Sequence, residues 1–348
     1  MLDQKEYVGV DLHKRFFIAH FTDEKGRQSQ TRRYETNPQQ LDVFMHDLHP
    51  EASIAVEPVS QWSWFCDTLE REGFDTHLAH PMQVKAIANA RIKTDKIDAK
   101  VLADLLRCNM LPEAYQSPLH VRQWKELTRH RLTFVCQRTQ NKNRIHAILF
   151  KNALSYEGVL WTKKGKAWLS EQQISDHHRL LINEHLQAIE ELDGHIAQMT
   201  TLIERAVENH EGAKLLMTIP GISYIWALTI MAEIGDVGRF KRASKLMSYA
   251  GLVPSTYSSG GNTRHGRITK RGSSWLRLAM IEVAHVQGRL RKSHGLRWYY
   301  DKMKLKKDSK TAAVATARKL LAVVWTVLSE GRPYEDRPRS GKRETRTN

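Results

Sequence analysis

Short apolar runs and amphipathic stretches alternate over the first hundred residues. Runs rich in β-branched and aromatic residues predict five strands, at 7–13, 16–22, 30–36, 53–58 and 76–81. Helical spacing of apolar residues predicts four helices, which begin at the Asn37–Pro38 pair, at Trp62, at residue 82 and at residue 95. Three leading strands followed by alternating helices and strands favour a mixed-sheet α/β domain.

The pattern becomes helical after residue 118. Residues 120–151 contain no Pro or Gly and predict one long basic helix, followed by a loop through Gly158 and Gly165. A heptad seam starts at Ile182 and runs to Ile203, with its positions alternately three and four apart. This spacing predicts a coiled-coil hairpin or a dimer arm.

The last third of the chain predicts a second helical region. Residues 214–235 predict two helices joined by a tight turn at Pro220–Gly221, which fits either an ordinary αα-corner or a phosphate-binding hairpin. A loop rich in Gly, Ser and Thr is predicted at 254–274. The remaining elements are a helix over 275–287, a basic connection over 289–310 and a helix over 312–329.

The predicted fold class is therefore α/β plus α. We expect four parts: a mixed-sheet domain over 1–118, a basic helix and coiled-coil arm over 119–210, a mostly helical domain over 211–330 and a disordered tail over 331–348. A chain of 348 residues has room for two or three domains with real cores.

Charge divides the chain in the same way. The net charge is +16, yet residues 1–118 contain 14 Lys and Arg against 18 Asp and Glu. The basic excess lies after residue 118 and predicts an anionic partner, most simply nucleic acid. An acidic part beside a basic part indicates a carboxylate metal site in one and polyanion binding in the other.

Several classes of protein are disfavoured. The three cysteines are far apart and form no CxxC pair, so neither a disulfide framework nor a zinc ribbon is predicted. No signal-peptide pattern begins the chain, and Arg318 and Lys319 interrupt the best apolar run. A reduced, soluble, intracellular protein with no membrane partner is expected. The absence of a GxxxxGK[ST] loop predicts no ATP.

Four acids stand where a sheet-based site needs them. Asp11 ends the first predicted strand, Glu57 ends the central one, and Asp95 and Asp98 share a helix face. Carboxylates suit Mg²⁺, and two such ions about 3.5–4 Å apart cleave phosphodiesters. Lys93, Lys96 and Lys100 are placed to hold phosphates. Each acid alone also fits a structural role, with Asp95 as an N-cap and Asp98 in a capping box, but together they favour catalysis.

The segment 251–274 combines serines, glycines and the cations Arg264, Arg267, Lys270 and Arg271. A hydroxyl among such cations is a candidate nucleophile on a phosphodiester. The alternative is a phosphate-binding loop whose serines only donate hydrogen bonds. The residues themselves favour that alternative, because no histidine base stands directly beside the serines and His265 is only the nearest candidate.

Taken in order, five motifs resemble a known family. They are YVGVDLHK (7–14), IAVEP (54–58), KTDKIDAKVLADLLR (93–107), the PGI turn (220–222) and GLVPSTYSSGG (251–261). The set resembles the DEDD-type insertion-sequence transposases, which have a ribonuclease-H-like, RuvC-like N-terminal domain and a serine-bearing C-terminal domain.

The resemblance implies a DNA recombinase that excises and inserts its own element. It implies that Asp11, Glu57, Asp95 and Asp98 are catalytic and bind Mg²⁺, with two ions expected. It also implies a serine nucleophile that forms a phosphoserine link to DNA. The family's serine precedes a glycine, which points to Ser259 rather than Ser258.

The partners implied by the resemblance are donor and target DNA, a structured non-coding guide RNA encoded by the element, and further copies of the chain in a dimer or tetramer. The protein would be cytoplasmic and nucleoid-associated in a prokaryotic cell. The candidate nucleic-acid contacts on the long helix are Arg122, Lys125, Arg129, Arg131, Arg138, Lys142 and Arg144.

Two other functions stay open. A metal-dependent endonuclease acting on structures such as Holliday junctions would use the same four acids with water as the nucleophile. A non-catalytic nucleic-acid-binding protein would use the acids only to cap helices and face solvent.

Overall fold

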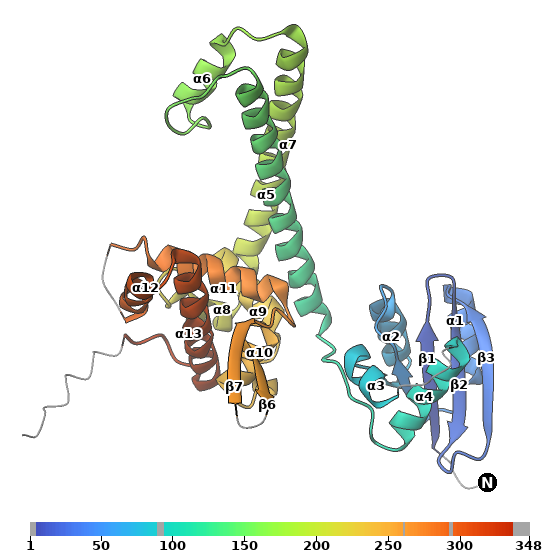
Figure 1. The fold of residues 1–348 in the computed structure, drawn as a ribbon. Coiled ribbons are helices and arrows are strands. Elements are labelled where there is room, and N and C mark those ends of the chain that lie inside the picture. Colours follow the sequence, from blue (N-terminus) through green and yellow to red (C-terminus); the bar gives the residue numbers. More distant parts are fainter. Residues whose placement is uncertain (1–4, 89–93, 260–261, 292–294, 337–348) are drawn as a thin grey trace, which may run out of the picture. The chain divides into compact units, whose positions relative to one another are not determined.

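A computed structural model describes residues 5–88, 94–259, 262–291 and 295–336. The chain divides into two compact units, Met1–Gln116 and Ser117–Asn348. The predicted arm and the predicted C-terminal helical region lie in the same unit. We call the first part the sheet unit and the second part the helical unit (Figure 1).

The sheet unit contains a five-stranded mixed sheet in the order β3-β2-β1-β4-β5. Its strands are β1 (Glu6–Leu12), β2 (Phe16–Asp23), β3 (Ser29–Glu35), β4 (Ser53–Val56) and β5 (Asp75–Leu78). The first three strands pair antiparallel, whereas β1, β4 and β5 pair parallel. All five predicted strands are confirmed, and with them the mixed sheet.

Helices cover both faces of this sheet. Val8, Val10 and Leu12 pack on one face against α1 (Pro38–Asp47) and α2 (Trp62–Arg71). On the other face, Ala55 packs with Leu102 of α4 (Asp95–Arg107) and with Val84 of α3 (Pro81–Ile87). Because side chains alternate along a strand, Gly9 and Asp11 belong to the α4 face. The predicted helix 82–92 ends at Ile87, and residues 89–93 lie outside the described part of the chain.

Helix α4 lies directly on β1 at Gly9. A Cβ atom at Gly9 would be 2.0 Å from the Ala99 carbonyl oxygen and 2.4 Å from the Ala103 nitrogen. No side chain fits there without moving the helix. The absence of a side chain at residue 9 therefore sets how closely the first turn of α4 approaches the end of β1.

Gly9→Ala is expected to lower the free energy of unfolding by about 1–3 kcal/mol or more, because an overpacked core typically costs this much. Urea unfolding followed by circular dichroism measures the effect. Gly194→Ala is the matched control, because Gly194 is an exposed helical glycine with open space around its Cβ position. The control should stabilise the protein by about 0.5–1 kcal/mol. A Gly9→Ala protein as stable as the wild type would contradict the close packing of α4.

The helical unit begins with a long antiparallel hairpin, which we call the arm (Figure 1). It consists of α5 (Leu119–Lys151), α6 (Lys163–Glu171) and α7 (Asp176–Glu208). Arg131 Nε donates to Thr200 Oγ1 (2.7 Å), and Arg138 Nη1 pairs with Asp193 Oδ1 (2.5 Å). Arg131 and Arg138 are seven residues apart in α5, and Asp193 and Thr200 are seven residues apart in α7. The heptad spacing therefore joins α5 to α7 within one chain.

The remaining helices form the largest hydrophobic core of the described chain. They are α8 (Glu211–Met217), α9 (Tyr224–Ile234), the short 3-10 helix η1 (Val237–Arg239), α10 (Ala243–Tyr249), α11 (Ser274–Gln287), α12 (Gly295–Lys306) and α13 (Ser309–Glu330). Helix α13 is long and apolar enough to span a membrane, but Ala317, Leu320 and Leu321 bury one side of it in this core.

Four segments differ from the sequence-based prediction. The predicted loop 254–274 contains a hairpin of β6 (Pro254–Ser259) and β7 (Asn262–Ile268). The basic connection 289–310 contains α12. Gly165 lies inside α6, where its Cβ position is 2.4 Å from the Leu160 carbonyl oxygen. Helix α10 was not predicted.

The first residues of the predicted tail make specific contacts. The Tyr334 amide donates to Thr218 Oγ1 (2.8 Å), and Asp336 Oδ1 accepts from the Gly295 amide (3.0 Å). The segment 331–336 therefore lies against the helical core, and residues 337–348 are outside the described chain.

Candidate active site

Two of the four acids lie at the ends of neighbouring parallel strands. Val10 of β1 pairs in register with Val56 of β4, and the Glu57 amide donates to the Val10 carbonyl oxygen (3.2 Å). Asp11 and Glu57 each follow one residue later, so both belong to the α4 face at the same edge of the sheet. Asp11 is buried, with 4% of its surface exposed.

The other two acids are in the first turn of α4. The N-cap is Thr94, whose hydroxyl accepts from the Ile97 amide (3.3 Å), so the alternative that Asp95 caps this helix is wrong. The Asp95 carboxylate is therefore not needed for capping. Asp98 is three residues further along the same turn, and the packing of α4 on Gly9 brings this turn to the end of β1.

The charges of the other three acids act on Asp11. The pKa of the Asp11 carboxyl is raised from 3.8 to about 6, mainly by burial and also by the neighbouring charges of Glu57, Asp95 and Asp98, against the opposing effect of His13. Three negative groups near a fourth, buried one form a site where a cation would be stabilised. The sequence-predicted acids are thus brought together at one end of the sheet.

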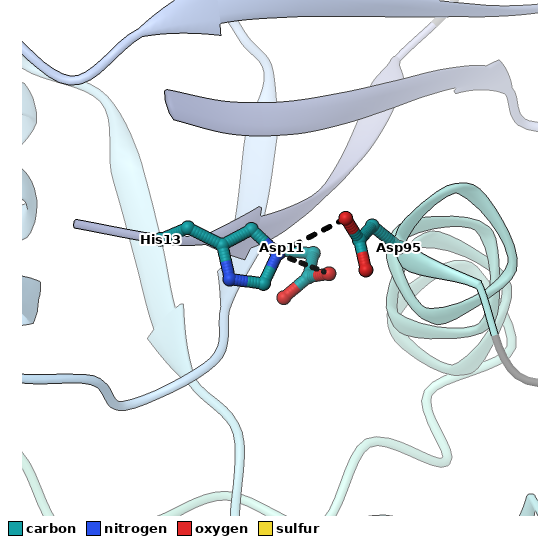
Figure 2. Close-up of side chains that lie close together, drawn as sticks. All are labelled: Asp11, His13 and Asp95. Atoms are coloured by element: carbon teal, nitrogen blue, oxygen red, sulfur yellow. Dashed lines mark hydrogen bonds and ion pairs between the residues drawn. The ribbon is translucent and has the colours of Figure 1, made fainter. Parts of the chain in front are cut away.

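His13 also belongs to this cluster, although it is not among the residues predicted from the sequence. Its Nε2 atom lies 3.1 Å from Asp11 Oδ2 and 3.4 Å from Asp95 Oδ2 (Figure 2). One ligand atom from each of these three residues lies within 4.8 Å of the other two, which is close enough for one metal ion. The available signal was the Asp-Leu-His spacing, which puts Asp11 and His13 on one side of a strand.

A cavity of about 260 Å³ opens beside the cluster. Glu57 and Asp98 line it together with Met82 and Val84 of α3, and Lys85 also contributes. Lys96 and Lys100 of α4 are exposed, as a phosphate-binding role requires, and Lys93 lies outside the described residues. Two of the four acids, Glu57 and Asp98, therefore face this cavity.

The raised pKa of Asp11 predicts a specific pH dependence for metal-free protein. Between pH 3.8 and about 6 the folded state keeps a proton that the unfolded state has lost, so the free energy of unfolding falls as pH rises. The stability of an Asp11→Asn variant relative to wild type should grow through this window and then level off. Urea unfolding in chelator at a series of pH values measures it. If the stabilities of wild type and Asp11→Asn changed with pH in parallel, the Asp11 carboxyl would not be buried and crowded as described.

The serine region lies in the helical unit. Ser259 is the last residue of β6, and its backbone pairs with Asn262 of β7. Ser258 is exposed, whereas the Ser255 hydroxyl donates to the Arg267 carbonyl oxygen (3.1 Å). The four predicted phosphate-binding cations, Arg264, Arg267, Lys270 and Arg271, are all exposed. The side chains of Ser259 and His265 lie outside what the structure describes.

Most of the cations predicted to bind nucleic acid along α5 have partners within the helical unit. Besides the contacts of Arg131 and Arg138 with α7, Arg129 pairs with Glu233, Lys125 Nζ donates to Ser117 Oγ (2.8 Å), and Lys142 Nζ lies 4.9 Å from the Trp161 ring centre. Arg122 is half-buried, and Arg144 is exposed. These contacts stabilise the arm and hold it against the rest of the helical unit, which is a role that cation density does not reveal.

Two regions of the chain match models of transposase families. Residues 213–301 match the Transposase IS116/IS110/IS902 family, and residues 8–151 match the DEDD transposase domain of IS110. The chain is 26% identical to the transposase for insertion sequence element IS1328 of Yersinia enterocolitica, over 93% of this chain and 97% of that protein. It is 24% identical to the transposase for IS1111A of Coxiella burnetii, over 94% and 90%. It is also 25% identical to the pilin gene-inverting protein of Moraxella bovis, over 96% and 98%.

Proposed function

Because the chain belongs to the IS110/IS116 family of transposases, which are DNA-recombining enzymes, we propose that it excises and inserts an insertion sequence by Mg²⁺-dependent strand cleavage with a serine nucleophile. The observation that supports this most is the convergence of Asp11, Glu57, Asp95 and Asp98 at one edge of the sheet. The gene-inverting relative favours DNA rearrangement over simple hydrolysis.

The donor set fits divalent metal. Asp11, Glu57, Asp95 and Asp98 offer hard oxygen atoms, and the crowding that raises the pKa of Asp11 is relieved by a bound cation. When bound, two such ions stabilise the attacking and the leaving oxygen of a phosphodiester. The protein's part is to hold the acids on a rigid strand pair and helix. Lys96 and Lys100 orient the phosphate of the strand.

Ser259 is the proposed nucleophile. Its Oγ forms a bond to phosphorus, one P–O bond of the DNA strand breaks, and the serine proton passes to the oxygen that leaves. The phosphodiester energy is kept in the phosphoserine, so the later joining step needs no ATP. The exposed cations Arg264 and Arg267 of the hairpin, and Lys270 and Arg271 just after it, offset charge on the phosphate.

A guide RNA is the proposed selector of donor and target DNA, and Arg144 and the exposed side of the arm are the proposed contacts. A dimer or tetramer would hold two duplexes, and the protein would act in the cytoplasm of a prokaryotic cell. RNA that copurifies with the full chain should come from the element and should be needed for recombination. Recombination of undiminished yield without RNA would contradict the guide role.

The alternative is a metal-dependent endonuclease that uses water. It predicts free phosphate ends and no protein bound covalently to DNA. Denaturing gels of a labelled donor DNA, run with and without protease treatment, distinguish the two. A labelled band that shifts down on proteolysis supports the recombinase, and its absence beside cleaved DNA supports the endonuclease.

A further inference from the structure

A carboxylate is buried where the arm meets the rest of the helical unit. Glu233 of α9 is 1% exposed. Its two carboxylate oxygens accept from Arg129 Nε (2.8 Å) and Arg129 Nη2 (3.0 Å), in a bidentate pair. The Arg129 guanidinium also lies 5.7 Å from the Trp275 ring centre in α11. A buried charge with this pairing is costly to leave unmatched, so the contact fixes α5 against α9.

The same carboxylate reaches the base of the β6–β7 hairpin. The Ser273 hydroxyl donates to Glu233 Oε2 (2.8 Å) and accepts from the Leu276 amide (3.0 Å), so it also caps α11. The Tyr249 hydroxyl donates to the Glu233 backbone carbonyl (3.3 Å). Tyr249 precedes β6 and Ser273 follows β7, so Glu233 is bonded to the chain on both sides of the hairpin.

The base of the hairpin is itself closely tied. The Ser273 amide donates to the Tyr249 carbonyl (2.8 Å), and the Lys270 amide donates to the Gly251 carbonyl (3.1 Å). Gly272 has a φ of +108°, and a Cβ there would be 2.0 Å from the Tyr249 carbonyl oxygen. A displacement of Ser273 or Tyr249 would therefore be passed on to the strands.

We propose that Glu233 is a positioning residue that sets the orientation of the β6–β7 hairpin relative to the arm, through Arg129 on one side and Ser273 on the other. This inference rests on the proposed function in one respect, because it gives the hairpin the nucleophile Ser259. Whatever binds the arm and shifts α5 then also shifts the strand that ends at the serine. Arg129, predicted from sequence to bind nucleic acid, acts through Glu233 in this proposal.

Hydrogen-exchange mass spectrometry of the full chain tests the coupling without any activity. Glu233→Gln should speed exchange at the Lys270 and Ser273 amides by about ten- to a hundredfold, the factor for loss of a hydrogen bond to a charged group. Arg129→Ala should do the same, although Arg129 bonds to neither residue. If Arg129→Ala speeds exchange only within α5, or if Glu233→Gln leaves the hairpin base unchanged, the proposal is overturned.

Two capping serines supply a matched control. Ser175 caps α7 by accepting from the His178 amide, as Ser273 caps α11 from Leu276, but Ser273 alone of these two also donates to Glu233. Ser273→Ala should speed exchange at the hairpin base, Ser273→Thr should restore it, and Ser175→Ala should leave it unchanged. Equal effects of Ser273→Ala and Ser273→Thr would contradict a role for the hydroxyl.

A kinetic readout separates positioning from general stability. Ser273→Ala should lower the single-turnover rate of protein–DNA adduct formation at saturating DNA by about tenfold or more, with the half-saturating DNA concentration unchanged. A change in the half-saturating concentration alone would contradict positioning. The two proposals can also fail separately. If the substitutions speed hydrogen exchange at the hairpin base as expected, but the wild-type chain forms no adduct through Ser259, then Glu233 positions the hairpin and only the proposed serine nucleophile is contradicted.

Discussion

A full-length chain with Asp11→Asn is expected to lose DNA strand cleavage by on the order of 10³-fold or more while it still binds DNA. Asp11 is buried at the end of β1 and interacts electrostatically with the charges of Glu57, Asp95 and Asp98. Asparagine has nearly the same size but no negative charge, so the oxygen ligand set loses its most central anion. Cleavage of labelled donor DNA with Mg²⁺, beside a filter-binding assay, measures both properties.

Asp104→Asn is the matched control for this loss. Asp104 lies on the same helix as Asp95 and Asp98, but it pairs with Arg107 (3.3 Å) outside the cluster. Its substitution should leave cleavage within about twofold of wild type, because surface ion pairs contribute little. An Asp11→Asn chain that still recombines DNA would favour a non-catalytic nucleic-acid-binding protein in which the acids only stabilise the fold.

The second large effect concerns the end of β6. Ser259→Ala is expected to abolish covalent protein–DNA adducts, because alanine has no side-chain oxygen that can form the phosphoester. DNA binding should stay within about twofold of wild type. Ser258→Ala is the neighbouring control and should keep forming adducts. Mass spectrometry of the peptide that retains a nucleotide after nuclease digestion identifies the modified serine.

The outcomes of the serine experiment separate the candidate functions. Adducts at the normal level in Ser259→Ala would show that the position is wrong, and Ser258 or Ser255 would be tested next. Cleaved DNA with free phosphate ends and no adduct in the wild type would identify water as the nucleophile. Neither outcome would affect the metal role of Asp11 and Glu57, which both candidate enzymes share.

The sheet unit was largely predictable because its determinants are local. Strand runs, the Asn37–Pro38 helix start and the Asp95–Asp98 spacing each appear as short patterns, and parallel strands meet at one edge of a sheet. His13 was missed because its role depends on the register of β1 against α4. That register is set by packing at Gly9, which a one-dimensional pattern does not contain.

The helical unit was harder to predict because long-range contacts determine it. The Gly- and Ser-rich segment 254–274 has weak strand propensity, yet its ends are held by Tyr249 and Ser273. Gly165 looked like a loop residue but is required where α6 approaches Leu160. Cation density along α5 predicted polyanion binding, whereas Arg129, Arg131 and Arg138 contact acids and hydroxyls of other helices.

Anomalous diffraction from crystals of the full chain grown with Mn²⁺ tests whether the four acids bind divalent metal at the end of β1. We expect manganese within about 2.5 Å of carboxylate oxygens of Asp11 and Glu57, and no such peak in Asp11→Asn crystals. Wild-type crystals with manganese bound only elsewhere, and with these carboxylates free of metal, would contradict it.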